Sequence, residues 1–149
     1  MSTETATLSP HRVLYTAEAT VTGGRSGHGR TSDGHLDVTL STPPEMGGPG
    51  GPGTNPEQLF ATGYAACFQS ALAGAARRDG LTVDDSTVTA LVGIGPLGEG
   101  RFGLVVTLRV HLPSIADRAV AEDLVARAHQ RCPYSNAIRG NVDVTLEIT

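Results

Sequence analysis

Hydrophobic and polar residues alternate with a period of two in five segments of the chain, a pattern typical of half-buried β-strands. The segments cover residues 15–23, 36–40, 88–94, 104–112 and 142–148. Turn residues rich in glycine separate the first from the second and the third from the fourth. We therefore expect two hairpins and one last strand.

Two loops of the chain are rich in glycine. Residues 23–29 form the wide turn of the first predicted hairpin, and Arg25 projects from it. Residues 43–54 contain a near repeat of Gly and Pro that cannot hold regular structure, so we expect a mobile surface loop there. Such a loop is either a plain linker or a flap over a site.

The longest predicted element is a helix from Pro56 to Asp79. Asn55 is a suitable N-cap with which Gln58 completes a capping pattern, and Gly80 provides a stop signal. Side chains at three-to-four spacing form a stripe of mostly small residues, which predicts a central helix packed closely against its neighbours. The stripe contains Leu59, Phe60, Gly63, Ala66, Cys67, Ser70, Ala71, Gly74 and Ala75.

A second helix is predicted to begin after Ser114, which forms a cap with Asp117, and to end near Cys132. Hairpins that alternate with helices predict an α+β fold with central helices and a largely antiparallel sheet. At 149 residues the chain is expected to form one domain over residues 1–149, with residues 1–12 as a flexible or loosely packed arm.

Composition and charge narrow the possible partners. The start of the chain lacks the basic and apolar stretches of a signal peptide, and no apolar run reaches the roughly 18 residues of a membrane span. We therefore expect a cytoplasmic protein without a membrane segment. The net charge of −4 and the scattered basic residues argue against nucleic-acid binding. All 11 basic residues are Arg, so a cationic catalytic group is Arg or His.

Only two cysteines are present, too few for the disulfide framework of a small secreted protein. Cys67 lies about three turns into the predicted long helix, beyond the reach of the helix dipole. In apolar surroundings an unassisted thiol has a raised pKa and is inert, as in a structural cysteine. A reactive Cys67 therefore needs a cation nearby.

Arg25 and Glu57 are the candidates for that cation and for the carboxylate that orients it, because an arginine fork bridges a carboxylate and a thiolate. The alternative for Glu57 is a favourable charge in the first turn of a helix. On one straight helix Glu57 lies about 15 Å from Cys67. Either the helix breaks between them, or Arg25 spans part of the gap, or a partner subunit supplies one group.

Two further sets of residues are candidates for chemistry. Cys132 precedes Pro133, which ends a helix and frees the backbone to rearrange, as a resolving cysteine requires; the alternative is an incidental cysteine. Aromatic side chains recur every four residues near Cys67 and are either an apolar substrate site or core residues. They are Phe60, Tyr64 and Phe68.

Two loop histidines, His28 and His35, lack a carboxylate or Cys at the usual ligand spacing, so we expect no metal site. The glycine loop of residues 47–53 is not followed by the Lys and Ser/Thr of a phosphate-binding loop.

Three motifs in order resemble the organic hydroperoxide resistance (Ohr) proteins of the OsmC/Ohr superfamily. They are Gly23-Gly24-Arg25, the run from Asn55 to Phe68, and Cys132-Pro133-Tyr134-Ser135-Asn136-Ala137. The resemblance extends from about Tyr15 to the end of the chain, and the surroundings of both cysteines are more similar to the Ohr branch than to the OsmC branch. The Gly/Pro-rich loop and residues 84–100 depart from the pattern.

The resemblance implies an intertwined homodimer and a thiol peroxidase that reduces organic hydroperoxides to alcohols. By matching position, Cys67 is the peroxidatic cysteine, Cys132 the resolving one, and Arg25 and Glu57 the activating pair. It further implies a Cys67–Cys132 disulfide that an external dithiol reopens, a dihydrolipoyl group on a lipoylated protein, with no bound cofactor. Two alternatives remain: an OsmC-like peroxidase with another peroxide preference, and a redox sensor that does not turn over.

Overall fold

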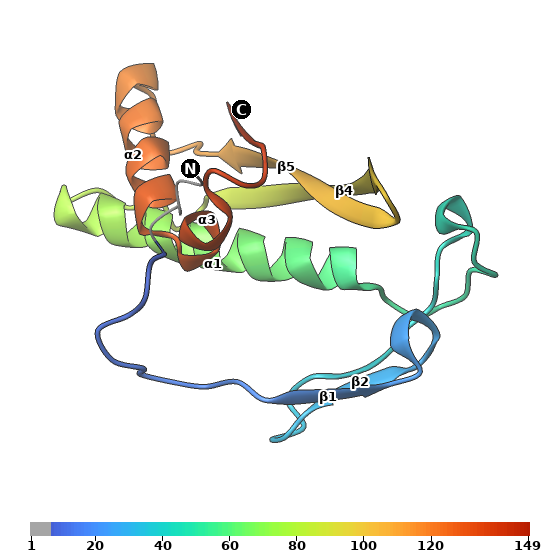
Figure 1. The fold of residues 1–149 in the computed structure, drawn as a ribbon. Helices are drawn as coiled ribbons and strands as arrows, with labels where there is room; N and C mark the ends of the chain where they lie inside the picture. The colour runs from blue at the N-terminus through green and yellow to red at the C-terminus, as the bar shows by residue number, and fades with distance from the viewer. Residues whose placement is uncertain (1–6) are drawn as a thin grey trace, which may run out of the picture. The chain divides into compact units, whose positions relative to one another are not determined.

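The computed structural model describes residues 7–149 of the chain (Figure 1). It divides the chain into two compact units, which meet in sequence between Pro56 and Glu57. The predicted arm falls partly on residues 1–6, which lie outside the described residues, while residues 7–12 are exposed and form neither helix nor strand. A single domain over residues 1–149 stays a prediction.

The first unit contains a small antiparallel sheet in the order β1-β2-β3 (Ala19–Thr22, His28–Thr31 and Asp37–Thr39). The predicted hairpin partner was wrong, because β1 pairs with β2 and only β2 pairs with β3. β2 begins inside the glycine loop, which shortens the turn to a 3-10 helix, Gly24–Ser26, that carries Arg25. β1 is also shorter than expected, since the four residues of β2 pair with only four of its own.

The Gly/Pro-rich segment of residues 43–54 is largely irregular, as predicted, apart from a 3-10 helix at Pro44–Met46. Backbone hydrogen bonds connect its two ends: the Thr54 amide donates to Thr39, and the Ser41 amide donates to Thr54. The Gly53 amide also donates to the Ser41 hydroxyl. The loop is therefore tied to the end of β3, and its predicted mobility stays a prediction.

The helix α1 spans Pro56–Arg78 without interruption, close to the predicted bounds. It ends as predicted at Gly80, whose φ of +70° lies in the left-handed region that glycine adopts without strain. The amide of Leu81 donates back to Ala76, a hydrogen bond typical of a glycine-terminated helix.

The face of α1 that is most deeply buried differs from the predicted stripe. Its large side chains recur every four residues, and they dominate the packing because they remove most apolar surface from water. The fully buried members are Tyr64, Phe68, Leu72, Ala75 and Ala76. Close packing of the small stripe occurs at Gly63, where a Cβ atom would lie 2.6 Å from the Tyr134 hydroxyl oxygen.

Three strands of the second unit form a sheet in the order β4-β5-β6 (Thr87–Gly98, Arg101–His111 and Val144–Ile148). The second predicted hairpin is confirmed, since β4 and β5 are antiparallel. Its turn is shorter than expected and centres on Glu99 and Gly100, both of which have positive φ. β6 adds to the sheet in parallel with β5.

Helix α2 spans Arg118–Arg131, and a short helix α3 spans Pro133–Ile138. The predicted cap at Ser114 was wrong: the Asp117 carboxylate accepts hydrogen bonds from the amides of Ala119 and Val120 and forms the N-cap. The Ser114 hydroxyl instead donates to Asp85. α3 was not predicted, because the motif that begins at Cys132 was read as a turn.

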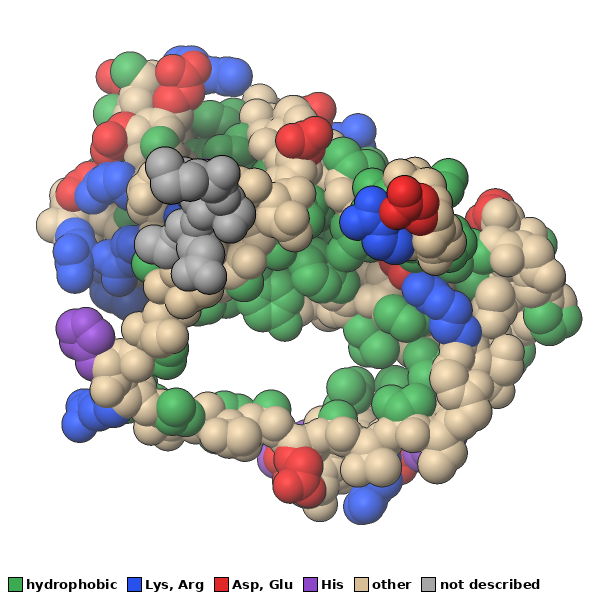
Figure 2. Space-filling model, in the orientation of Figure 1, with side chains coloured by type: hydrophobic (Ala, Val, Ile, Leu, Met, Phe, Trp, Pro, Cys, Tyr) green, Lys and Arg blue, Asp and Glu red, His purple; other side chains and the backbone are tan. Residues whose placement is uncertain are grey.

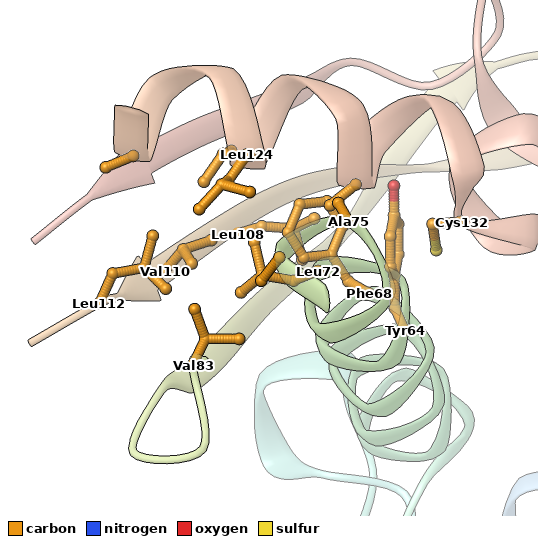
Figure 3. Packing of buried hydrophobic residues seen from close by; sticks show 14 of the residues in the cluster. Tyr64, Phe68, Leu72, Ala75, Val83, Leu108, Val110, Leu112, Leu124 and Cys132 are labelled. Carbon is orange, nitrogen blue, oxygen red and sulfur yellow. The ribbon is translucent and has the colours of Figure 1, made fainter. Parts of the chain in front are cut away.

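One hydrophobic core lies between α1, α2 and the inner face of the sheet of the second unit (Figure 3). It joins the buried face of α1 to the inward residues Val106, Leu108 and Val110 of β5 and to Leu124 of α2. Each such large apolar side chain contributes about 1.5–3 kcal/mol when fully buried. Cys132, at the junction of α2 and α3, belongs to the same cluster.

The described helices include none that is long and apolar enough to cross a membrane. On the face of the molecule in Figure 2, acidic and basic side chains are interspersed over most of the surface. The basic side chains gather on the left of the view, over the end of α1 that Figure 1 places there.

Candidate active site

Both thiols of the chain meet in the second unit. Cys67 lies on α1 and is partly exposed, whereas Cys132 caps the end of α2 and has no exposed surface. Cys132 lies near enough to Cys67 to act on the pKa of its thiol, and both thiols are free in this structure. Residues 65 positions apart in the sequence are thus brought close together by the packing of α1 against the α2–α3 junction.

The environment of Cys67 favours its neutral thiol. Burial raises the pKa of Cys67 above its ordinary value, and the hydrogen bond and charge interaction with Cys132 raise it further. The backbone N–H of Tyr134 opposes this, because it donates to the Cys67 sulfur and stabilises a thiolate. Raising contributions dominate, so activation of Cys67 requires a cation in addition to these groups.

The predicted aromatic residues separate into two environments. Tyr64 and Phe68 have no exposed surface and are core residues in the chain, whereas Phe60 is partly exposed. Phe60 and Tyr64 pack edge to face with ring centres 5.9 Å apart. Tyr134, which was not predicted, completes the group, with its ring centre 5.7 Å from each of the other two. These three rings therefore form an apolar wall. Tyr134 connects the wall to the thiol, because its backbone N–H acts on Cys67.

A buried polar chain runs behind the two thiols, and sequence reasoning missed it. The Tyr64 and Ser135 hydroxyl oxygens are 2.6 Å apart, and the Ser135 oxygen is 2.8 Å from Nδ1 of His129. Burial raises the pKa of Tyr64, against the lowering effect of Ser135, and both cysteines add to the rise. Burial and the charge of Arg139 lower the pKa of His129, which favours its neutral form.

The sequence contained one signal for this group of hydrogen-bonded side chains. His129 and Ser135 flank the Cys132-Pro133 pair, and polar residues beside a buried cysteine need partners. Tyr64 could not be connected to them from sequence, because it lies 71 residues before Ser135.

Arg25 lies in the first unit, on the 3-10 helix Gly24–Ser26. One of its guanidinium nitrogens is 3.9 Å from the Met46 sulfur, and its carbonyl accepts a hydrogen bond from the Thr42 hydroxyl. Glu57 lies in the first turn of α1. Because α1 is uninterrupted, the alternative of a helix break between Glu57 and Cys67 is wrong.

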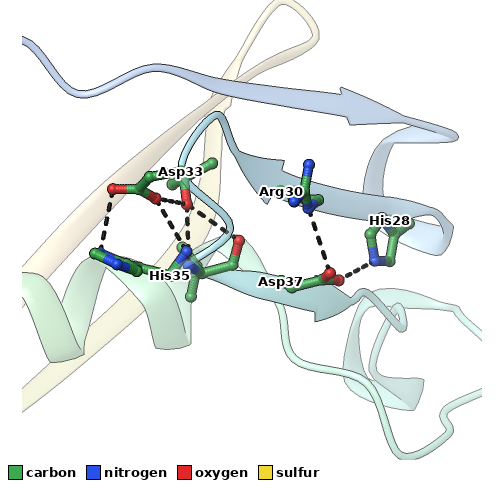
Figure 4. A network of polar contacts seen from close by, with 7 residues as sticks. His28, Arg30, Asp33, His35 and Asp37 are labelled. Atoms are coloured by element: carbon green, nitrogen blue, oxygen red, sulfur yellow. Dashed lines mark hydrogen bonds and ion pairs between the residues drawn. The ribbon is translucent and has the colours of Figure 1, made fainter.

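Each of the two histidines considered for a metal site, His28 and His35, pairs with a carboxylate (Figure 4). His28 contacts Asp37 at 2.5 Å, and Asp37 also faces Arg30 at 3.6 Å. The His35 ring contacts Asp33 at 3.2 Å. These are exposed pairs, and residues 7–149 contain no group of three or more His, Cys, Asp or Glu placed to hold a metal ion.

A family model described as OsmC-like protein matches residues 48–147. An organic hydroperoxide resistance protein of Xanthomonas axonopodis pv. citri is 55% identical over 141 residues, which cover 94% of this chain and 98% of the relative. This chain belongs to the Ohr group of the OsmC-like family.

Solved structures of Ohr proteins have the same fold. One from Legionella pneumophila has a TM-score of 0.88 and 48% identity, and the match covers 93% of this chain and 99% of that one. OhrB of Bacillus subtilis has a TM-score of 0.83 and 44% identity, with 92% and 100% covered. The fold assigned from sequence as α+β of Ohr type is thereby confirmed.

Replacing Ser135 with Ala should lower the free energy of unfolding by about 1–3 kcal/mol, because the buried hydroxyl of Tyr64 loses its partner. Urea denaturation of the reduced protein measures this change. Ser70→Ala is the matched control, since Ser70 is exposed on α1 and its replacement should change stability little. Equal stabilities of the two variants would contradict the importance of the buried chain.

Replacing Cys132 with Ala should lower the pKa of Cys67, because Cys132 contributes two of the effects that raise it. The pH dependence of alkylation of Cys67 by iodoacetamide, followed by mass spectrometry, reports that pKa. The alkylation profile of the variant should shift to lower pH than that of the wild type. An unchanged profile would show that burial alone sets the pKa.

Proposed function

We propose that the protein is a cysteine-based peroxidase that reduces organic hydroperoxides to alcohols and so provides resistance to them. The observation that carries the proposal is that a partly exposed thiol, Cys67, has a buried thiol, Cys132, as a neighbour close enough to act on its pKa. The names of its Ohr relatives supply the substrate class. A buried partner that meets an accessible nucleophile is the arrangement that a peroxidatic and a resolving cysteine require.

The first step consumes the peroxide. The Cys67 thiolate attacks the distal oxygen of the hydroperoxide, the O–O bond breaks, and the alkoxide takes a proton and leaves as the alcohol. Cys67 is then a sulfenic acid. Cys132 attacks its sulfur, the hydroxyl leaves as water with the thiol proton, and a Cys67–Cys132 disulfide forms. The Tyr134 amide, which donates to the Cys67 sulfur, supports the anionic form.

Arg25 is the proposed source of the positive charge that Cys67 lacks, and Glu57 the carboxylate that holds the Arg25 fork. The raised pKa of Cys67 supports this role, because its own surroundings do not produce a thiolate. With α1 continuous, two arrangements remain: the Arg25 side chain extends toward Cys67 within one subunit, or one subunit activates the other.

An apolar wall for the organic part of the substrate is proposed at Phe60 and Tyr134, both of which keep exposed surface. Tyr64 completes this wall from the core side, and Phe68 supports the helix behind it. The disulfide is reopened by an external dithiol, a dihydrolipoyl group of a lipoylated protein, so the proposed cycle needs no bound cofactor.

A homodimer is the proposed assembly. The sheet β1-β2-β3 has three or four residues in each strand, and all four residues of β1 are exposed. Apolar side chains are also exposed on both strands of the β4-β5 hairpin, including Leu97 on β4 and Phe102 on β5. Short sheets with an uncovered apolar face are marginal in water, so a second copy is the proposed cover.

Stopped-flow kinetics test the proposed activity. Wild-type protein should reduce an organic hydroperoxide faster than hydrogen peroxide and turn over with dihydrolipoamide. Cys67→Ser should abolish turnover, whereas Cys132→Ser should keep the first oxidation step but form no intramolecular disulfide. Full turnover of Cys67→Ser would refute the mechanism. Faster reduction of hydrogen peroxide would favour an OsmC-like preference, and oxidation without turnover would favour a sensor.

Light scattering after size-exclusion chromatography tests the assembly. We expect about twice the 15.4 kDa mass of the chain at micromolar concentration. Val21→Glu, which replaces the exposed apolar side chain of β1 with a charge, should weaken the dimer, while Thr20→Glu on the opposite face of that strand is the control. A monomeric wild-type protein with full activity would exclude a site shared between subunits.

A further inference from the structure

A pocket of about 400 Å³ opens beside Cys67 on the surface of the second unit. It lies between the C-terminal half of α1 and the α2–α3 junction, and Cys132 is not part of its lining. The lining residues are Cys67, Ser70, Ala71, Gly74, Arg77, Arg131 and Pro133. The pocket therefore gives access to the accessible sulfur and not to the buried one.

Two guanidinium groups converge over this pocket at Gly74. A Cβ atom at Gly74 would lie 3.1 Å from Nη2 of Arg131 and 3.9 Å from Nη2 of Arg77. The absence of a side chain there leaves room for Arg131 to lie against the helix. Arg77 and Arg131 come from different helices, so the fold, and not local sequence, brings their charges together.

The charge of this pair is not neutralised within the part of the chain that the structure describes. Neither Arg77 nor Arg131 is in an ion pair with a carboxylate of residues 7–149. Both side chains lie in the last turn of a helix, where the dipole favours a cation. The dipole accounts for an arginine at each helix end. The dipole does not account for two arginines that converge beside a thiol. Their combined positive charge makes the pocket a site for an anion.

We propose that this pocket receives the reducing dithiol as its thiolate, with Arg77 and Arg131 holding the anion while it attacks Cys67. The proposal rests on the proposed function, because the electrophile is the Cys67–Cys132 disulfide. The lining favours this ligand over the organic tail of a peroxide, since small and charged residues surround it and the aromatic wall of Phe60 and Tyr134 is not among them.

The chemistry of the step is thiol–disulfide exchange. One thiolate of the dithiol attacks the Cys67 sulfur, a mixed disulfide forms, and Cys132 leaves as a thiolate that takes a proton. The second thiolate of the dithiol then attacks the sulfur of its own molecule that is bonded to Cys67. Cys67 leaves as a thiolate, and the dithiol is released as a cyclic disulfide. Two electrons pass from the dithiol to the protein.

Reduction measured apart from peroxide chemistry tests the proposal. The Cys67–Cys132 disulfide is prepared with diamide, and its reduction by uncharged dihydrolipoamide is followed under second-order conditions. Arg77→Gln and Arg131→Gln should each slow reduction about two- to fivefold, and the double variant about tenfold, because each removes one exposed charge. The double variant should also lose most of the salt dependence of the wild-type rate.

Arg78→Gln is the matched control, because Arg78 is the exposed neighbour of Arg77 and does not line the pocket. It removes the same charge and should leave the reduction rate unchanged. Oxidation by an organic hydroperoxide, measured on the reduced proteins, should be unchanged in Arg78→Gln and should be slowed less than reduction is in Arg77→Gln and Arg131→Gln. Melting temperatures of the variants confirm that each is folded.

Three results would overturn the proposal: equal slowing by Arg78→Gln, slowing of peroxide oxidation in place of reduction, or failure of diamide to form the disulfide. The proposed function fails separately. If an organic hydroperoxide does not oxidise Cys67 while reduction of the diamide-formed disulfide still depends on both arginines, the pocket assignment stands and the peroxidase assignment falls.

Discussion

The packing of α1 against the α2–α3 junction is the contact on which the rest of the site depends. Tyr64 and Phe68 bury one face of α1 in the core, and this fixes the rotation of the helix. Cys67 lies at the edge of that face and is directed to the junction, where the end of α2 buries Cys132. Gly63 and Gly74 allow this close approach, since a side chain at either would meet Tyr134 or Arg131. The same contact therefore positions both thiols, the aromatic wall and the arginine pocket.

That contact also creates a conflict. Burial positions the thiols accurately, but it raises the pKa of Cys67 and so disfavours the thiolate that a nucleophile needs. One N–H group, from Tyr134, acts in the opposite direction. No cation is among the groups that act on the pKa of Cys67, so a thiolate there needs a positive charge that these groups do not supply. The need for a nearby cation, inferred first from the position of Cys67 in its helix, therefore also follows from the surroundings of Cys67.

Elements whose signals are local, such as α1 and the β4-β5 hairpin, were predicted well from sequence, whereas β2 was not. α1 begins at a proline and ends before a glycine, so its bounds could be read within a residue or two. β2 contains no alternating pattern of its own, and its strand conformation comes from pairing with its two neighbours. The two cysteines could be identified from sequence as candidate redox residues because few other side chains undergo thiol chemistry. The chain from Tyr64 to Ser135 and the convergence of Arg77 with Arg131 were not, because each joins residues far apart in sequence.

The unequal burial of the two thiols sets a direction for the chemistry. Because Cys132 is completely buried and Cys67 is not, an external reagent can reach only the Cys67 sulfur. In the proposed cycle, the oxidant and the reductant must then react at the same sulfur atom at different times: the Cys67 thiolate attacks the oxidant, whereas the reductant attacks the Cys67 sulfur of the disulfide. Attack on a disulfide runs along the S–S bond, so a reductant must approach Cys67 from the side opposite to Cys132. An oxidant meets a lone thiolate and is free of that constraint. The proposed aromatic wall at Phe60 and Tyr134 and the arginine-lined pocket would provide two such approaches to one sulfur, one apolar and one cationic.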